Sequence, residues 1–132
     1  MRKTGQPPGT KPENHLPLTP TVFHILLALA DEDRHGYGII QEVKLRTQDR
    51  VHLMAGTLYG AIKRLLERGL IVETDDRPDP ELDDERRRYY RLTDFGQRVL
   101  AAEVARLEEQ VQQARSKQLI PKSKPAPATV GV

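Results

Sequence analysis

The period of the apolar residues changes twice between residues 19 and 118, and this order constrains the fold more than any other feature of the chain. A helical period holds over the first three segments, gives way to the two-residue alternation of strands, and returns in a long last segment. The predicted elements are, in chain order, helices over 20–30, 37–47 and 55–68, strands over 70–74 and 88–92, and a helix over 94–118. This order predicts a mainly α fold with a small β-hairpin, namely a winged helix-turn-helix with a long C-terminal dimerisation helix.

Capping residues support these boundaries. Thr19 precedes Pro20, which places a hydroxyl at the N-cap and a proline at the first helical position. Gly69 follows the third predicted helix at the position of a C-terminal cap. Thr93 caps the last predicted helix, and Pro121 ends it. Local signals therefore agree with the periodicity at both ends of the central region.

Length and composition exclude several classes of protein. The chain has 132 residues, enough for one domain, and no cysteine, which excludes disulfides and thiolate metal sites. Its four histidines do not fall at close metal-ligand spacing, and its apolar runs are far shorter than the roughly 20 residues of a membrane span. His35 lies near Asp31 and Asp33 in sequence, but no pairing of nucleophile and base is suggested. We expect a cytoplasmic protein that is not an enzyme and needs no cofactor or metal.

The formal net charge of +2 does not by itself indicate a partner. Residues 1–18 carry a net +2 and residues 117–132 carry +3, so residues 19–116 carry −3. Because the central region is mildly acidic, any case for nucleic-acid binding depends on where individual cations lie.

The third predicted helix has one apolar face and one face suited to nucleic acid. The apolar face contains Leu58, Ile62, Leu65 and Leu66. The opposite face, with Tyr59 at its boundary, contains Gly56, Thr57, Gly60, Lys63, Arg64 and Glu67. Cations and hydroxyls suit phosphates and base edges, while glycines, which cost up to about 1 kcal/mol each in a helix, let a backbone approach a groove wall. The alternative is an ordinary solvated surface helix.

The predicted hairpin has a basic base and an acidic tip. Residues 86–91 read RRRYYR, and strand alternation predicts that one of Tyr89 and Tyr90 packs on the core while the other is a surface aromatic. The connection over 75–85 contains seven acids and one arginine, and these acids would repel phosphates. Either the acidic tip points away from DNA while the arginines reach it, or neighbouring acids hold the arginines and the wing contributes little.

The last predicted helix carries a heptad-like line of apolar residues. Its members are Leu100, Val104, Leu107, Val111 and Ala114. A helix of this length spans roughly 36 Å, more than the three-helix unit beside it, so part of the line must meet another surface. That surface is either the helix's own domain or, as the 3.5-residue period favours, the same helix of a second subunit. A twofold dimer would place two third helices on one side of the particle.

These observations divide the chain into four parts. We expect a disordered N-terminal tail over 1–18, a winged helix-turn-helix DNA-binding domain over 19–92, a C-terminal dimerisation helix over 93–118 and a disordered Pro/Lys tail over 119–132. The leading hypothesis is a dimeric DNA-binding protein. A winged-helix module that docks a protein partner without binding DNA is the alternative.

Four sequence blocks resemble the PadR family of bacterial transcriptional regulators. They are HGYGII at 35–40, GTLYGAIKRL at 56–65, ERGLI at 67–71 and RRYYRLTDFG at 87–96. The similarity covers about residues 19–115. It implies a winged helix-turn-helix homodimer, usually a repressor, that binds double-stranded DNA at an inverted-repeat operator and is released by a small, often aromatic, effector.

The resemblance also implies roles for individual residues. DNA-binding positions carried over from the family are Thr57, Tyr59, Lys63 and Arg64 in the recognition helix, Tyr37 near the DNA backbone, and Arg87 and Arg88 at the base of the wing. Glycine at Gly60, where relatives often carry a larger residue, and the acidic connection depart from the family pattern. With a single C-terminal helix, as in the family's short subgroup, an effector pocket would lie at the dimer interface.

Overall fold

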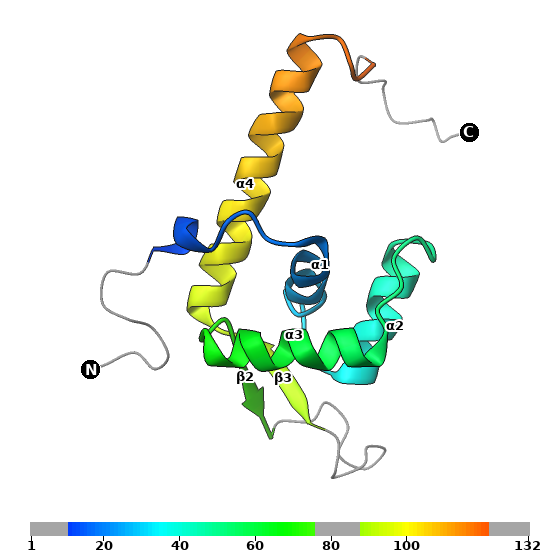
Figure 1. Ribbon diagram of the computed structural model, residues 1–132, viewed down its shortest axis with the longest axis vertical. Coiled ribbons are helices and arrows are strands. Elements are labelled where there is room, and N and C mark those ends of the chain that lie inside the picture. The colour runs from blue at the N-terminus through cyan, green and yellow to red at the C-terminus, as the bar shows by residue number, and fades with distance from the viewer. Residues whose placement is uncertain (1–10, 76–87, 122–132) are drawn as a thin grey trace.

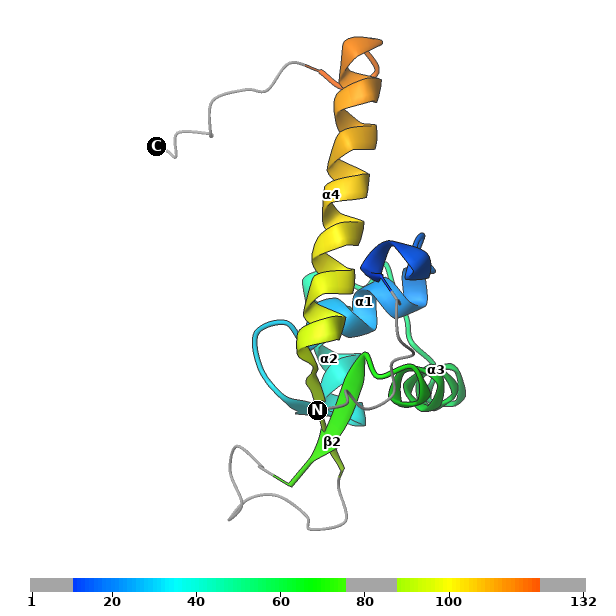
Figure 2. The same cartoon turned by 90° about the vertical axis from the view of Figure 1, so that its left-hand side faces the viewer.

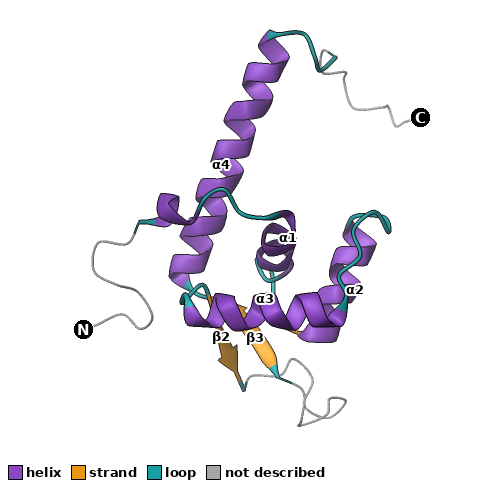
Figure 3. Ribbon diagram, viewed as in Figure 1, coloured by secondary structure: helices purple, strands orange, loops and turns teal. Residues whose placement is uncertain are grey.

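The computed structural model describes residues 11–75 and 88–121 and contains the six elements that the sequence predicts (Figures 1 and 3). They are α1 (Pro20–Ala28), α2 (Gly36–Arg46), α3 (Ala55–Glu67), β2 (Ile71–Thr74), β3 (Tyr89–Leu92) and α4 (Asp94–Ser116). Two short elements were not predicted, the 3-10 helix η1 (Pro12–His15) and the strand β1 (Arg34–His35). A mainly helical chain with a small sheet and a long last helix confirms the predicted winged helix-turn-helix fold.

The elements form a compact base from which two features project. Helices α1, α2 and α3 lie together at the base, and the β2–β3 hairpin extends from one side of it (Figure 1). Helix α4 starts beside this base and rises well beyond α1, away from the hairpin (Figure 2). None of the helices in the described ranges combines the length and apolar character that a membrane span requires.

The sheet has three antiparallel strands in the order β1-β3-β2. In β1, His35 pairs with Tyr89 of β3, and their rings meet edge to face at a centroid distance of 5.0 Å. Tyr89 and Tyr90 are both buried, with 7% and 4% of their surface exposed. The prediction that one of these tyrosines is a surface aromatic is therefore wrong, because the His35 ring of β1, a strand that the sequence did not predict, packs against Tyr89 while Tyr90 joins the hydrophobic core.

One hydrophobic core joins the helices to the sheet. Its fully buried members include Ile25, Leu26, Ile39, Val43, Leu58, Leu65, Leu70, Ile71 and Val99. In α3, Ala61 and Ile62 are buried as well, whereas Leu66 is only partly buried. Helix α3 thus buries the face that the sequence predicts, and its opposite face remains outside the core.

The start of α4 fixes the hairpin to the end of α3. The Thr93 hydroxyl caps α4 by accepting a hydrogen bond from the Gly96 amide at 2.9 Å, and it donates to the Gly69 carbonyl at 2.7 Å. Gly69 itself has a φ of 75°, a conformation that favours glycine. A Cβ at Gly96 would lie 2.0 Å from the Leu70 carbonyl oxygen. This close approach fixes the start of α4 against the residue that joins α3 to β2.

The N-terminal segment differs from the expectation of a disordered tail over 1–18. Residues 11–18 include η1, which packs against α4. The Leu18 amide donates to Glu103 Oε2 at 3.1 Å, and Arg106 donates to both Glu103 oxygens at 2.6 and 2.9 Å. Glu103 is 2% exposed, and the hydrogen bonds from Arg106 lower its pKa. The prediction is wrong for 11–18; residues 1–10, like 122–132 of the predicted C-terminal tail, lie outside the described residues.

Candidate nucleic-acid interface

Helix α3 presents a continuous outward face at the base of the molecule. Its exposed residues include Gly56, Thr57, Tyr59, Lys63 and Arg64, with Gly60 partly buried among them. These are the residues that the helical wheel assigns to the outer face, so the predicted division of α3 into two faces is confirmed. That they contact DNA remains a prediction.

The cations of α3 differ from most arginines elsewhere in the chain. The arginines outside α3 that form ion pairs within the described residues are Arg34 with Asp31, Arg46 with Glu42, Arg88 with Glu73, Arg91 with Asp33 and Arg106 with Glu103. Within residues 11–75 and 88–121, Lys63, Arg64 and Arg68 form no ion pair, and all three are exposed. The N–H groups of these three side chains are therefore available to an external anion such as a phosphate.

The two glycines on this face are not required by the fold. A Cβ at Gly56 would have no neighbour within 4 Å, and a Cβ at Gly60 would meet only Arg64 Nη1 at 3.8 Å. Neither residue has the positive φ that favours glycine. By contrast, a Cβ at Gly36 would lie 2.0 Å from the Tyr59 hydroxyl, so a side chain at that position would displace the Tyr59 ring from the start of α2. Gly56 and Gly60 each destabilise α3 without serving a contact in the described chain, which favours close approach to an external surface.

Two tyrosines lie where α2 meets α3. The Tyr59 hydroxyl contacts the start of α2 at Gly36, while about half of the Tyr59 side chain stays exposed. Tyr37 is 60% exposed, and its ring stacks on His35 at 6.4 Å with an interplanar angle of 15°. His35 Nδ1 accepts a hydrogen bond from the Gly38 amide at 2.9 Å and so caps α2. His35 was not predicted as a site residue, although its place just before a helix start was a signal for a cap.

The base of the wing is described only in part. Arg88 is exposed, and its Nη1 donates to Glu73 Oε2 at 2.9 Å, a hydrogen bond that raises the pKa of Arg88. This contact agrees with the alternative in which neighbouring acids hold the arginines. An exposed ion pair is weak, so a phosphate can compete for the guanidinium. Arg87 and nearly all of the acidic connection lie outside the described residues.

The apolar line on α4 divides into a buried and an exposed part. Leu100 is 5% exposed and belongs to the core of its own domain, so its prediction as a dimer contact is corrected. Val104 and Val111 are 44% and 41% exposed, and Leu107 between them is partly buried. An apolar strip therefore continues along α4 beyond the core.

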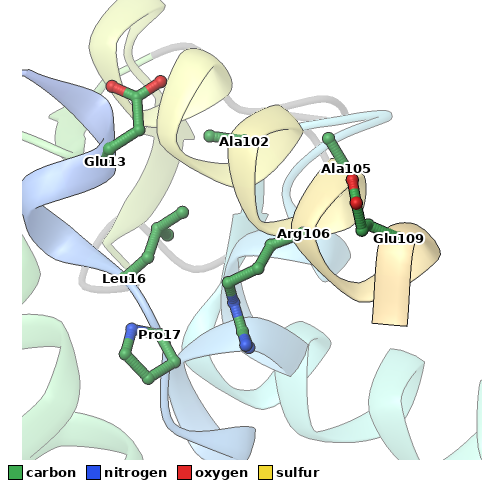
Figure 4. A pocket seen from close by; sticks show the side chains of 7 residues that line it. All are labelled: Glu13, Leu16, Pro17, Ala102, Ala105, Arg106 and Glu109. Atoms are coloured by element: carbon green, nitrogen blue, oxygen red, sulfur yellow. The ribbon is translucent and has the colours of Figure 1, made fainter. Parts of the chain in front are cut away.

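A cleft of about 500 Å³ lies between residues 13–17 and α4 (Figure 4). It is lined by Glu13, Leu16, Pro17, Ala102, Ala105, Arg106 and Glu109. At 100° per residue, Ala105 and Glu109 point away from the Val104–Val111 strip, so this cleft does not lie on the face of α4 that is predicted to form the dimer. Among the described residues, no group of His, Asp or Glu is placed to hold a metal ion.

The geometry defines a winged helix-turn-helix protein whose third helix presents exposed cations beside a β-hairpin. Residues 25–102 match the transcriptional regulator PadR-like family, and the chain belongs to this family. The family predicted from the sequence blocks is thereby confirmed. Members of this family are DNA-binding transcriptional regulators, and this chain is one of them.

Several known proteins are similar to this chain in sequence or structure. An uncharacterised protein from Lysinibacillus sphaericus is 34% identical over 77 residues, which cover 58% of this chain and 68% of the relative. A transcriptional regulator from Clostridium thermocellum is similar in structure, with a TM-score of 0.61, 25% identity and coverage of 76% of this chain and 90% of that one. A PadR family transcription regulator from Clostridium difficile has a TM-score of 0.56 and 28% identity, covering 76% and 97% of the two chains.

Proposed function

We propose that this protein is a homodimeric, sequence-specific repressor that binds an inverted-repeat operator through α3. The observation that carries the proposal is the outer face of α3, where exposed cations that pair with no acid of the described residues lie beside two glycines that the fold does not need. Lys63 and Arg64 would bind phosphates or guanine edges, and Thr57 would reach a base edge or phosphate. Tyr37 and Tyr59 would contact the DNA backbone, with Arg87 and Arg88 adding contacts from the wing.

Dimerisation would use the exposed part of α4. This helix of 23 residues is about 35 Å long, and its upper half extends beyond the core with Val104, Leu107 and Val111 on one face. Pairing with the same strip of a second subunit would remove these side chains from water and bring two α3 helices to one side of the dimer. A small effector that binds at this interface would change the spacing of the two helices and release the operator.

The test measures DNA binding by variants of α3. A duplex selected by the wild-type protein from a random pool serves as the probe in mobility-shift titrations at several salt concentrations. Lys63→Ala and Arg64→Ala should each weaken binding about tenfold or more, and removal of a phosphate-binding side chain should lower the salt slope by about one unit. Arg115→Ala, which removes an exposed cation near the far end of α4, should bind as the wild type does.

Wild-type affinity in both α3 variants would contradict the assignment of α3 as the recognition helix. Failure of the wild-type protein to select or bind any duplex at low salt would instead favour a winged-helix module that docks a protein partner. Repression is tested separately, by the output of a reporter that carries the selected site within its promoter.

A further inference from the structure

The connection between α2 and α3 contains strained backbone. Residues 47–54 lead from the end of α2 to the start of α3. Gln48 and Asp49 have φ values of 55° and 66°, in the left-handed region that residues with a Cβ seldom adopt. Their amides donate to the Leu45 and Lys44 carbonyls at 3.2 and 2.9 Å, which closes the end of α2. Contacts that hold the end of α2 therefore also hold the direction in which the chain continues to α3.

Arg46, the last residue of α2, joins this turn to α1. Its Nη1 lies 3.0 Å from His24 Nδ1, and its Nη2 donates to the His24 carbonyl at 3.2 Å. Glu42 accepts from the same guanidinium, from Nε at 2.8 Å and from Nη2 at 2.9 Å. Thr47, the next residue, accepts a hydrogen bond from the Val51 amide at 3.1 Å, which ties this group to the turn. We call the partly buried side chains of His24, Glu42 and Arg46 the α1–α2 clamp.

The clamp requires a neutral His24. A guanidinium has only donors, so His24 Nδ1 must accept the hydrogen bond from Arg46 as an unprotonated nitrogen. The pKa of His24 is lowered, first by burial and then by the charge of Arg46, while Glu42 acts in the opposite direction. Both charged groups come from α2; among the described residues, no charged group of α3 or α4, which also pack against α1, contributes. Protonation of Nδ1 would turn the acceptor into a donor and set a second positive charge against the guanidinium.

We propose that the α1–α2 clamp positions α3 for DNA binding and that protonation of His24 opens it, so that DNA affinity falls in mild acid. The inference rests on the proposed DNA-binding function and adds to it a positioning residue, Arg46, outside the predicted interface. Helix α3 packs on both α1 and α2, so an open clamp changes the two surfaces that hold the recognition helix. The strained turn over 47–54 also relaxes when the clamp no longer holds it. Affinity should be full above the ordinary histidine pKa of 6.5 and should decrease as pH falls through the lower pKa of the folded protein.

The experiment replaces His24 by a side chain that accepts a hydrogen bond but does not titrate. In His24→Asn the amide oxygen takes the place of Nδ1, so the bond from Arg46 can form at every pH. Affinity for the duplex selected by the wild-type protein is measured between about pH 8 and pH 5 at constant ionic strength. The ratio of wild-type to variant affinity should be constant above about pH 7 and fall about three- to tenfold by about pH 5. Taking this ratio removes the pH dependence that other histidines give to DNA binding.

Two further variants serve as comparisons. Arg46→Lys keeps the charge but loses the forked donors, so it should bind about threefold more weakly, or worse, at neutral pH, with the flat pH profile of His24→Asn. His15→Asn removes another partly buried histidine whose pKa is lowered, in η1 against Phe95, and should keep the wild-type pH profile. Circular dichroism at each pH checks that all variants stay folded.

An NMR titration gives a second readout that needs no DNA. In the wild-type protein, the Nε–H signal of Arg46 and the amide signals of Gln48 and Asp49 should shift with the same midpoint as the His24 ring. Different midpoints would overturn the inference and leave the proposed function intact. The wild-type pH profile in His24→Asn, or an equal flattening in His15→Asn, would do the same. If the wild-type protein binds no duplex, the proposed function itself fails, and this inference fails with it.

Discussion

Replacing the two glycines on the outer face of α3 by alanine should strengthen the fold and weaken DNA binding. Neither Gly56 nor Gly60 has a positive φ, and the added methyl groups would meet only Arg64 Nη1 at 3.8 Å from the second position. Alanine in a helix interior, as at Gly60, is favoured over glycine by about 0.5–1 kcal/mol, and the gain is smaller at Gly56, the second residue of α3. The double variant should therefore gain about 1 kcal/mol in unfolding free energy, or roughly 3–6 °C in Tm.

The same double variant should bind DNA more weakly, although its fold is more stable. If the glycines let a groove wall approach the α3 backbone, two methyl groups hold the duplex away from Lys63 and Arg64, and affinity should fall at least about tenfold. The assays are thermal unfolding at one protein concentration and mobility-shift titration with the selected duplex. The matched control is Ala101→Gly on the exposed surface of α4, which should lower Tm and leave DNA affinity unchanged.

Two outcomes would refute this reasoning. Unchanged DNA affinity in Gly56→Ala/Gly60→Ala would show that close approach does not explain the glycines. A lower Tm in the double variant would show that the fold needs both glycines. That result would contradict the open space that the structure shows around both positions.

Three further predictions concern the rest of the molecule. Gly96→Ala should destabilise the fold by about 1–3 kcal/mol, because a Cβ would lie 2.0 Å from the Leu70 carbonyl oxygen; an unchanged urea midpoint would contradict this packing. Val111→Asp should shift the protein from dimer to monomer in sedimentation equilibrium while circular dichroism stays constant, whereas Gln112→Glu on a neighbouring exposed position should not. Since folding lowers the pKa of Glu103, its stabilising effect should be full above its ordinary pKa near 4.5 and vanish as pH falls through the lower folded value. Glu103→Leu, which offers no acceptor, should remove this pH dependence and speed hydrogen exchange of the Leu18 amide, and a protected amide in that variant would argue against the anchor.

Much of the helical frame could be predicted because its signals are local. The apolar period of α3 selects the face that packs inward, and caps at Thr19, Gly69 and Thr93 set helix ends through contacts a few residues apart. The same local pattern identified the outer face of α3. The sequence blocks that resemble the family lie on these elements, and the family match over 25–102 confirms them.

Other features depended on residues far apart in the chain. The pairing of His35 with Tyr89 creates β1 and buries a second tyrosine, and the bond from Leu18 to Glu103 crosses 85 residues to order a segment whose composition resembles a tail. Leu100 fits the heptad as well as Val104 does, but only packing against the core shows that it is buried. Sequence alone thus determined the four long helices and the outer face of α3, because apolar periodicity and caps lie within one element, and it located both hairpin strands through their local alternation. The tertiary structure decided which side chains on those elements stay exposed and unpaired, because burial and ion pairing depend on which distant residues come together.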